Sequence, residues 1–472
     1  MLAYGAFVPH PPIILEDIGG TQRKKALKTV EAMENIAQRL AATNPETILI
    51  FSPHGPVFQD GLAIWGGRCL QGDLSRFGSR RTWQWEVDRE LIDAIIEEGS
   101  KENLPCLELT DDHFFRYGIE PQLDHGVLVP LSFLADDRVR LVATGMSLLP
   151  WLEQYTLGVA IGRAVHKSTR RIAVIASGDL SHCLQPGGST PYDPRGKEFD
   201  ETLMALLRAQ KREALFDLDP ILVEKAAECG FRTLLMLLGV FDGLKVEIEV
   251  LNYEGPYGVG YGVVSFQPRG KEQTKDSLLT MLRRRRGEAM RKLRAEESPF
   301  VRLARLTVEN YLLGKELPDA LAFLQGSGGE TAYVEGKQQA GAFVSIKKNG
   351  QLRGCIGTIF PTQPNFAEEV KHNAIAAAVQ DPRFDPIQAP ELSALTYSVD
   401  RLGLPQPVAD PEVLDPQKYG VIVRRAGKTG LLLPNLDGIE TVEEQVAIAK
   451  QKAGIGRNEE VQLERFEVIR YF

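Results

Sequence analysis

The segment ETILIFSPHGP, residues 46–56, decides the fold of the first half of the chain. Its apolar run, Ile48 to Phe51, has the length and the β-branched content of a buried strand. The run ends at Ser52–Gly55, where proline and glycine turn the chain. His54 is thereby placed at the carboxyl end of a strand, which is where open α/β sheets bind their ligands. The segment predicts an α/β sheet that carries a titratable, metal-competent side chain at its ligand-binding edge.

Length and composition describe a multidomain chain. Its 472 residues are too many for one ordinary core, so two or three domains are expected. The content of 43% hydrophobic and 25% charged residues is typical of globular proteins in water. Neither a membrane span nor a signal peptide is expected, because no apolar run reaches about 18 residues and the first residues are not basic.

Net charge and cysteine content indicate which partners and which cellular location to expect. A net charge of −8 argues against nucleic acid as a partner of the whole chain. The five cysteines are scattered and odd in number, so they do not form a disulfide framework. A reducing cytoplasm is therefore the expected location.

Strand-like runs alternate with amphipathic helical patterns over residues 1–267. Helical spacing of apolar residues covers 23–42 and 196–210. The predicted strands are 3–8, 47–51, 62–65, 139–144, 171–176, 245–251 and 262–266. This alternation predicts an α/β domain whose sheet has helices on both faces.

The composition changes after residue 267. Residues 268–299 contain almost no β-branched residues and include the block Arg283–Arg286. They predict a basic, partly helical linker rather than a nucleic-acid contact, because no aromatic side chains interleave with the arginines. Residues 300–472 start with a helical pattern and continue through strands, which predicts a smaller, independent α+β domain.

Six of the seven histidines lie in the first domain, and three of them follow predicted strands. These three are His10, His54 and His182. A single histidine is more often a hydrogen-bonded structural residue, but three in equivalent positions favour a metal or catalytic site, because strand ends can meet at one edge of a sheet. His125, in an Asp-His-Gly loop before an apolar segment, has a similar position.

Two histidines leave a metal site incomplete, so a third ligand is expected. Glu228 and Cys229 precede an apolar helical pattern, and Glu254 lies in a glycine-rich segment. A carboxylate would complete the two-histidine-one-carboxylate face of Fe(II) oxygenases, whereas a thiolate would favour zinc or copper. Glu228 is the preferred candidate, and Cys229 is the close alternative.

Residues 1–267 resemble the class III extradiol dioxygenases, the LigB-like catalytic subunits, and the related Memo proteins. The resemblance is carried by VPHPP, SPHG, LDHGVLVPL and SGDLSH, in the family's order. It implies that His10 and His54 bind non-haem Fe(II), that His182 is the acid–base residue and that His125 contacts the substrate. The family's third ligand is a glutamate in dioxygenases and a cysteine in Memo proteins, and the stretch ECGFR, residues 228–232, offers both.

The resemblance implies an extradiol-type dioxygenase that acts on a catechol- or aminophenol-like aromatic and dioxygen. A neutral His182 can take a proton from the second substrate hydroxyl and later return one. Asp179 is expected to orient that imidazole, and Tyr253 and Tyr257 are candidates to line the pocket. Two other readings stay open: a catalytically silent metal- or ligand-binding protein, and a zinc hydrolase.

Residues 300–472 resemble the AMMECR family. The matching stretches are GAFVSIKKNGQLRGCIGT and DPRFDPIQAPELSALTYSVDRL. The fusion resembles bacterial and archaeal proteins of a system that links AMMECR, Memo and radical-SAM components, which implies a radical-SAM protein partner. The AMMECR resemblance implies no particular activity.

One cysteine of the second domain has a distinctive context. Cys355 stands between two glycines in LRGCIG and lies two residues from Arg353. A nearby cation can lower the pKa of a thiol, but most buried cysteines are inert, so a functional and a structural role both stay open. Arg383, flanked by aspartates, is expected to fix a loop by ion pairing.

Overall fold

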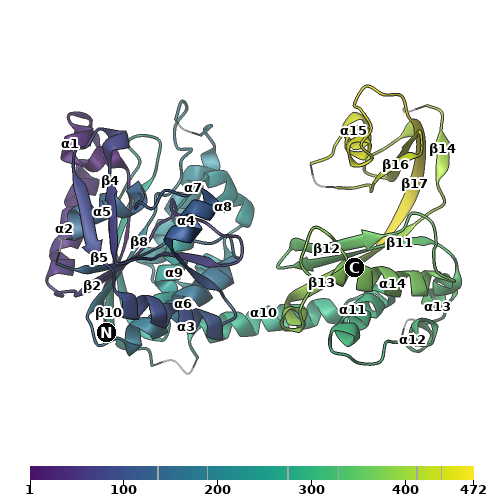
Figure 1. The fold of residues 1–472 in the computed structure, drawn as a ribbon, viewed down its shortest axis with the longest axis horizontal. Coiled ribbons are helices and arrows are strands. Elements are labelled where there is room, and N and C mark those ends of the chain that lie inside the picture. The colour runs from purple at the N-terminus through teal and green to yellow at the C-terminus, as the bar shows by residue number, and fades with distance from the viewer. Residues whose placement is uncertain (136–137, 189, 274–275, 328, 411–412, 437) are drawn as a thin grey trace. The chain divides into compact units, whose positions relative to one another are not determined.

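The structure is a computed structural model that describes residues 1–135, 138–188, 190–273, 276–327, 329–410, 413–436 and 438–472 (Figure 1). Within these residues the chain forms two compact units, Met1–Arg285 and Arg286–Phe472. The first unit is a mixed sheet flanked by helices, and the second is a smaller α+β unit. The predicted fold class is thus confirmed.

The sheet of the first unit has a parallel centre. Strands β7, β2, β8 and β1 are parallel neighbours, so their carboxyl ends share one edge of the sheet. β3 runs antiparallel to β7, and β10 runs antiparallel to β1 and β9. A separate hairpin joins β4 and β5. The strand order is β6 (Cys106–Leu109), β3 (Leu62–Trp65), β7 (Arg140–Thr144), β2 (Thr47–Phe51), β8 (Ile172–Ser177), β1 (Leu2–Val8), β10 (Tyr261–Lys271) and β9 (Leu244–Glu254); the hairpin is β4 (Cys69–Asp73) and β5 (Thr82–Glu86).

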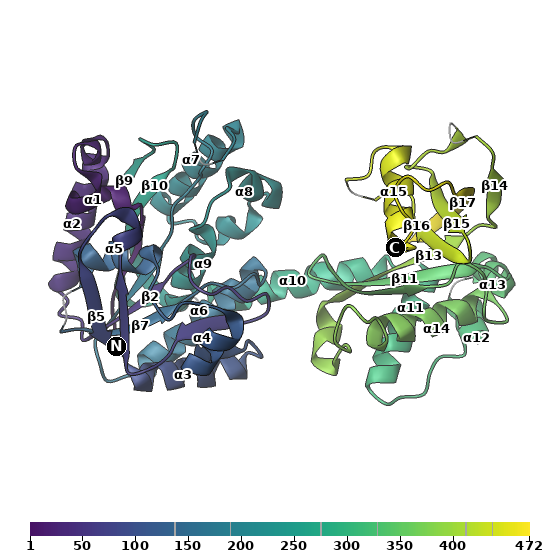
Figure 2. The same cartoon turned by 45° about the horizontal axis from the view of Figure 1, so that its top comes forward.

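Helices cover both faces of this sheet. Every residue of β2, β3 and β8 is buried, as expected for continuous apolar strands in an α/β layer. On one face lie α2 (Leu27–Ala41) and α5 (His125–Leu134); on the other lie α3 (Arg89–Lys101), α6 (Trp151–Lys167) and α9 (Phe231–Val240) (Figures 1 and 2). The remaining helices of the unit are α1 (Glu16–Gly19), α4 (Asp111–Tyr117), α7 (Pro194–Arg208) and α8 (Pro220–Ala226). No helix of the described segments combines the length and the apolar character needed to cross a membrane.

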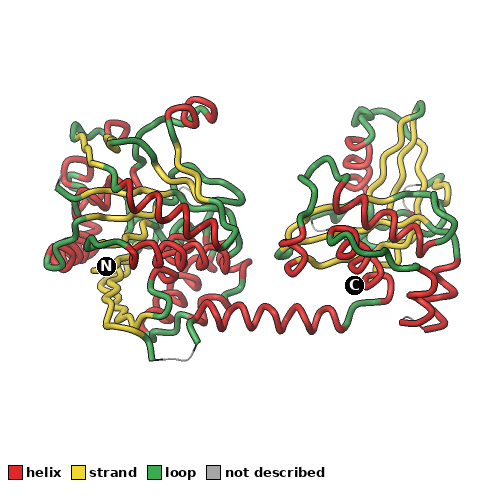
Figure 3. Tube along the Cα trace, turned by 60° about the horizontal axis from the view of Figure 1, so that its bottom comes forward, coloured by secondary structure: helices red, strands yellow, loops and turns green. Residues whose placement is uncertain are grey.

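The second unit is built on antiparallel strands. The order is β12 (Gln351–Gly357), β11 (Gly341–Lys348), β13 (Leu395–Leu402), β17 (Gln462–Tyr471), β15 (Tyr419–Arg425) and β16 (Lys428–Leu432), with β14 (Gln406–Val408) also on β17. Helices α11 (Pro299–Leu312) and α14 (Phe366–Val379) pack against β11–β13, and α15 (Val442–Lys452) packs against β15 and β16 (Figures 1 and 3). The other helices are α12 (Ala320–Ser327) and α13 (Gly329–Lys337).

The boundary between the units falls inside α10 (Leu278–Ala295), which carries the arginine block. Three of these arginines form ion pairs with carboxylates: Arg283 with Glu102, Arg284 with Asp276 and Arg285 with Asp217. Exposed pairs of this kind contribute at most about 1 kcal/mol each. They offset the charge of three of the four arginines in the block.

Candidate metal centre

Three imidazoles from separate elements converge at the carboxyl edge of the parallel strands. His10 follows β1, His54 follows β2, and His125 is the first residue of α5. One ring nitrogen of each lies within 4.8 Å of the others. The closest approach is 2.9 Å, between His10 Nε2 and His54 Nε2.

The donor set fits a divalent transition metal. The distance of 2.9 Å between His10 Nε2 and His54 Nε2 is close to that of two imidazole nitrogens that bind one metal ion. In that arrangement each nitrogen lies about 2.1 Å from the metal, and the angle at the metal is a right angle. The His10 ring is oriented from its other side, because Nδ1 lies 2.9 Å from Ser177 Oγ at the end of β8. Metal-binding imidazoles are typically fixed by such a second hydrogen bond.

Desolvation and the neighbouring histidines keep these imidazoles neutral, although His54 is exposed at the surface. It lowers the pKa of His10 well below the usual value, and the neighbouring histidines lower that pKa further. Burial and then His125 lower the pKa of His54 to about 4. Burial also lowers the pKa of His125 and of His182. Near pH 7 the rings therefore present unprotonated nitrogens, the form that binds a metal ion.

Of the two adjacent third-ligand candidates, Cys229 faces the cluster. Its Sγ lies 3.7 Å from His10 Nε2 and accepts a hydrogen bond of 3.3 Å from the N–H of Asp179. The Glu228 carboxylate instead accepts a hydrogen bond of 2.5 Å from the N–H of Phe231, at the start of α9, and burial raises its pKa to about 7. The thiol thus lies beside His10 while the carboxylate bonds to the start of α9, and the choice between Glu228 and Cys229 as third ligand stays a prediction.

Two glycines explain the position of Cys229. A Cβ atom on Gly178 would lie 2.1 Å from the Cα of Gly230, so the two segments pack backbone against backbone. The carbonyl of Asp179 accepts hydrogen bonds from the N–H groups of Cys229 and Gly230, at 3.3 and 2.9 Å. The sequence signals SGD and CG are thus the two halves of one contact, which places the thiol beside His10.

Asp179 holds His10 and not His182. Its Oδ1 accepts a hydrogen bond of 3.0 Å from the N–H of His10, and its Oδ2 lies 3.8 Å from His10 Nε2. Burial raises the pKa of Asp179 to about 7. The expected role in orienting His182 is therefore corrected to a role in fixing the first histidine.

His182 lies close enough to the cluster to affect its charge. Its ring lowers the pKa of both His10 and His54. Nδ1 of His182 is buried and has no hydrogen-bond partner among the residues that the structure describes. Burial lowers the pKa of His182, and the carbonyls of Ala227 and Leu180 oppose part of that effect. The ring is therefore neutral near pH 7.

The start of α5 ties His125 to the His54 loop. Asp124 Oδ1 accepts hydrogen bonds from the N–H of Gly126, at 2.7 Å, and from the Ser52 hydroxyl, at 2.6 Å. The rings of His54 and His125 stack with their centroids 4.4 Å apart. The sequence motifs Ser-Pro-His-Gly and Asp-His-Gly therefore form one structure, and the roles of Ser52 and Asp124 were not predicted from the sequence.

Three residues expected near the site are hydrogen-bonded to groups other than the histidines. Glu254 accepts two hydrogen bonds from Thr29, at 2.9 and 2.6 Å. The Tyr253 hydroxyl donates to Asp200 at 2.8 Å, and the Tyr257 hydroxyl donates to a backbone carbonyl near the N-terminus. These hydrogen bonds engage groups other than the histidines, and the predicted roles of Glu254 as a third ligand and of the tyrosines as pocket residues stay predictions.

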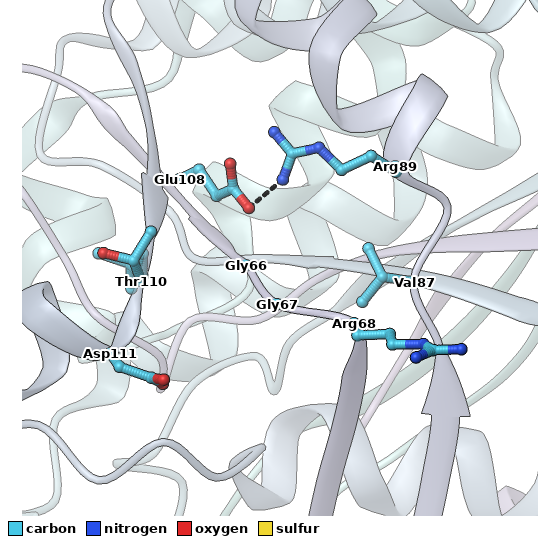
Figure 4. Close-up of a pocket in the computed structure, with 9 residues that line it drawn as sticks. Gly66, Gly67, Arg68, Val87, Arg89, Glu108, Thr110 and Asp111 are labelled. Carbon is cyan, nitrogen blue, oxygen red and sulfur yellow. Dashed lines mark hydrogen bonds and ion pairs between the residues drawn. The ribbon is translucent and has the colours of Figure 1, made fainter.

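A hollow of about 470 Å³ lies at the opposite edge of the same sheet (Figure 4). Val87, in its lining, bridges to Leu141, the second residue of β7. The next residue, Asp88, accepts a hydrogen bond from Thr47, the first residue of β2. His54 follows the last residue of β2, so the hollow and the histidine cluster are at different ends of the strands. An ion pair between Arg89 and Glu108 crosses the hollow.

Comparisons with known proteins agree with this description. The family model described as the catalytic LigB subunit of aromatic ring-opening dioxygenase matches residues 4–264, and the AMMECR1 model matches residues 301–471. Protein CA_C1420 of Clostridium acetobutylicum is 38% identical over 98% of both chains. A protein of Thermotoga maritima is 49% identical over 37% of this chain and 98% of its own.

Two solved structures are also similar. Uncharacterized protein PH0010 from Pyrococcus horikoshii has 28% identity and a TM-score of 0.32, and the match covers 36% of this chain and 88% of that one. Uncharacterized protein JW3007 from Escherichia coli K12 has 18% identity and a TM-score of 0.39, with 56% and 99% covered. The first unit is a LigB-type domain of the aromatic ring-opening dioxygenase class. The chain belongs to the LigB family and carries a C-terminal AMMECR1 domain.

Proposed function

We propose that the first unit is a metal-dependent oxidoreductase of the extradiol-dioxygenase type, acting on a catechol- or aminophenol-like aromatic with dioxygen. The observation that carries the proposal is the approach of His10 Nε2 and His54 Nε2 to 2.9 Å in a LigB-type domain. A bound Fe(II) would supply Lewis-acid activation of the substrate oxygens and a route for electrons to dioxygen. The proposed location is the cytoplasm, where free thiols stay reduced.

The proposed ligands are His10, His54 and Cys229. Neutral imidazoles support this set, as does the thiol beside His10 Nε2. Glu228 is the alternative third ligand, and its carboxylate would have to leave the N–H of Phe231 to take part. Because a thiolate is a soft ligand, zinc and copper are the alternatives to Fe(II) at this set of ligands.

The other two histidines act on the substrate in this proposal. His182, neutral and with an unpartnered Nδ1, accepts a proton from the second substrate hydroxyl and returns one to the product oxygen. His125, stacked on His54, donates a hydrogen bond to a substrate oxygen and so orients the ring over the centre. Asp179 and Ser177 fix the backbone and the ring of His10, which keeps the first ligand in one orientation.

A second candidate function is a metal- or ligand-binding protein without turnover, which docks a radical-SAM partner. The position of Cys229 favours it, because Fe(II) oxygenases typically use a carboxylate where this chain presents a thiol. In that case the same residues would hold an ion that does not activate dioxygen.

Oxygen consumption separates the two candidates. The full chain, purified anaerobically and loaded with Fe(II), is supplied with a panel of catechols and aminophenols in an oxygen electrode. The proposal expects uptake that depends on one of these compounds and that His182→Gln abolishes without loss of metal. The matched control is His166→Gln, which changes a histidine that bonds to the carbonyl of Gly162 within its own helix, α6. A metal-loaded chain that consumes no oxygen with any compound would favour the second candidate.

A further inference from the structure

An aromatic side chain stands at the exposed side of the candidate metal centre. His54 is exposed and His125 is half-buried, whereas His10 is buried. The ring of Phe77, in the connection between β4 and β5, lies 5.4 Å from the ring of His125, measured between centroids. Phe77 is itself 42% exposed. An apolar ring is therefore accessible from solvent beside the two histidines through which the centre reaches the surface.

The turn that carries Phe77 has a fixed backbone. The N–H groups of Phe77 and Ser79 donate to the carbonyl of Leu74, at 2.9 and 3.2 Å. Leu74 and Ser79 are buried, and the Ser79 hydroxyl donates to Asp17. Gly78 closes the turn with a φ of 90°, which glycine adopts without strain. The phenyl ring is therefore exposed on an ordered turn.

The hairpin of β4 and β5 is attached to the segment that leads into His125. The carbonyl of Gln71, on β4, accepts a hydrogen bond of 2.9 Å from the N–H of Leu123. A Cβ atom on Gly72 would lie 3.0 Å from the carbonyl oxygen of Leu123, so β4 packs directly on the backbone of that segment. These contacts hold the turn with Phe77 and the start of α5 with His125 in one arrangement.

An exposed phenyl ring in this position favours an aromatic ligand. Water is released when a ligand covers apolar surface, which is favourable. Two aromatic rings attract each other beyond the effect of burial when they pack edge to face or offset. Because the turn is already ordered, the ligand does not have to fix it on binding, and little conformational entropy is lost.

We propose that Phe77 is a specificity-determining residue of the metal centre, whose ring packs against the aromatic ring of a ligand held at the histidines by its polar atoms. This inference rests on the proposed function and deepens it, because it assigns the selection of aromatic over aliphatic ligands to one side chain. Phe77 carries no proton and binds no metal. Its contribution is therefore to the affinity for the aromatic ring and not to the affinity for the ion.

Two hydroxamates separate these affinities. Acetohydroxamate and benzohydroxamate bind a metal ion through the same pair of oxygen atoms, but one carries a methyl group and the other a phenyl ring. The full chain is loaded with Zn(II), which oxidises neither compound, and the Kd of each is measured by calorimetry. The proposal expects the preference for benzohydroxamate, taken as the ratio of the two Kd values, to fall about tenfold in Phe77→Ala, the effect of one aromatic pair. The zinc content and the Kd of acetohydroxamate should stay unchanged.

Two further variants complete the test. Phe77→Tyr retains an aromatic ring and should retain the preference. Phe115→Ala, which removes an aromatic residue that is 93% exposed on α4, is the matched control and should leave the preference unchanged. A preference that Phe77→Ala does not change, or that Phe115→Ala lowers equally, would overturn this inference and leave the metal centre intact. A chain that binds neither zinc nor either hydroxamate would overturn the metal centre and this inference with it.

Discussion

Replacing Gly178 by alanine tests whether backbone packing builds the metal centre. The new Cβ would lie 2.1 Å from Gly230 Cα and 3.1 Å from Gly230 N. Non-bonded carbons rest about 3.5 to 4.0 Å apart, so the two segments must separate by about 1.4 Å or more. Overpacking costs about 1 to 3 kcal/mol, and we expect about 3 kcal/mol here because backbone, which cannot rotate away, stands on both sides.

The same separation carries Cys229 away from His10. Metal–ligand distances tolerate a deviation of only about 0.2 Å, so a shift of this size breaks the proposed bond from the thiolate to the ion. We expect the affinity of the full chain for a divalent metal to fall at least about tenfold, which corresponds to about 1.4 kcal/mol. Stability and metal binding should therefore decline together.

The assay can address the first unit alone. All four tryptophans lie in it, so urea unfolding of the full chain followed by tryptophan fluorescence reports on this unit. Metal affinity is measured by competition with a chromogenic chelator. In the control Gly188→Ala, the nearest atom is 3.7 Å from the new Cβ, so a change within about 0.5 kcal/mol is expected. A Gly178→Ala chain with the unfolding midpoint and the metal affinity of the original chain would refute this reasoning.

Three further predictions concern the same unit. His182→Gln should lower the turnover number about 10² to 10⁴-fold at unchanged metal content, because it removes only the proton carrier; equal loss of metal would contradict that role. Burial raises the pKa of the Cys229 thiol well above its usual value, so metal binding by this thiol must release a proton. Chelator competition should therefore show a metal affinity that rises about tenfold per pH unit from pH 6 to 8. Cys229→Ala should flatten this slope, and a flat slope in the original chain would exclude the thiol as a ligand. Asp88→Ala should destabilise the unit by about 2 to 4 kcal/mol in urea, because Asp88 caps α3 and is the buried partner of Arg170; an unchanged midpoint would show that this network contributes nothing.

The central strands can be predicted from the sequence alone, because their apolar runs are continuous. Residues 47–51 and 62–65 are strands with the predicted bounds. The strand predicted at 262–266 instead continues to Lys271, through Pro268. Its pairing with β1 covers only Val264 to Phe266, so Pro268 lies beyond that ladder and its missing N–H costs no hydrogen bond there.

The sequence alone does not indicate whether the side chain of Glu228 or that of Cys229 lies beside His10. Neighbouring residues in a turn point in different directions, and the direction depends on the preceding backbone. Ala227 has a φ of 51°, in the left-handed region that residues other than glycine rarely adopt. No sequence pattern indicated this conformation, although it precedes the turn that sends the carboxylate to α9 and the thiol to His10.

The most direct test of the metal centre is the metal content of the full chain after anaerobic purification, compared with that of His10→Ala and His54→Ala. His166→Ala, on α6, is the matched control. We expect about one equivalent of a divalent transition metal in the original chain and in the control, and almost none in either of the other two variants. Equal metal in all four proteins would mean that His10 and His54 do not share an ion, and the proposed centre would be wrong.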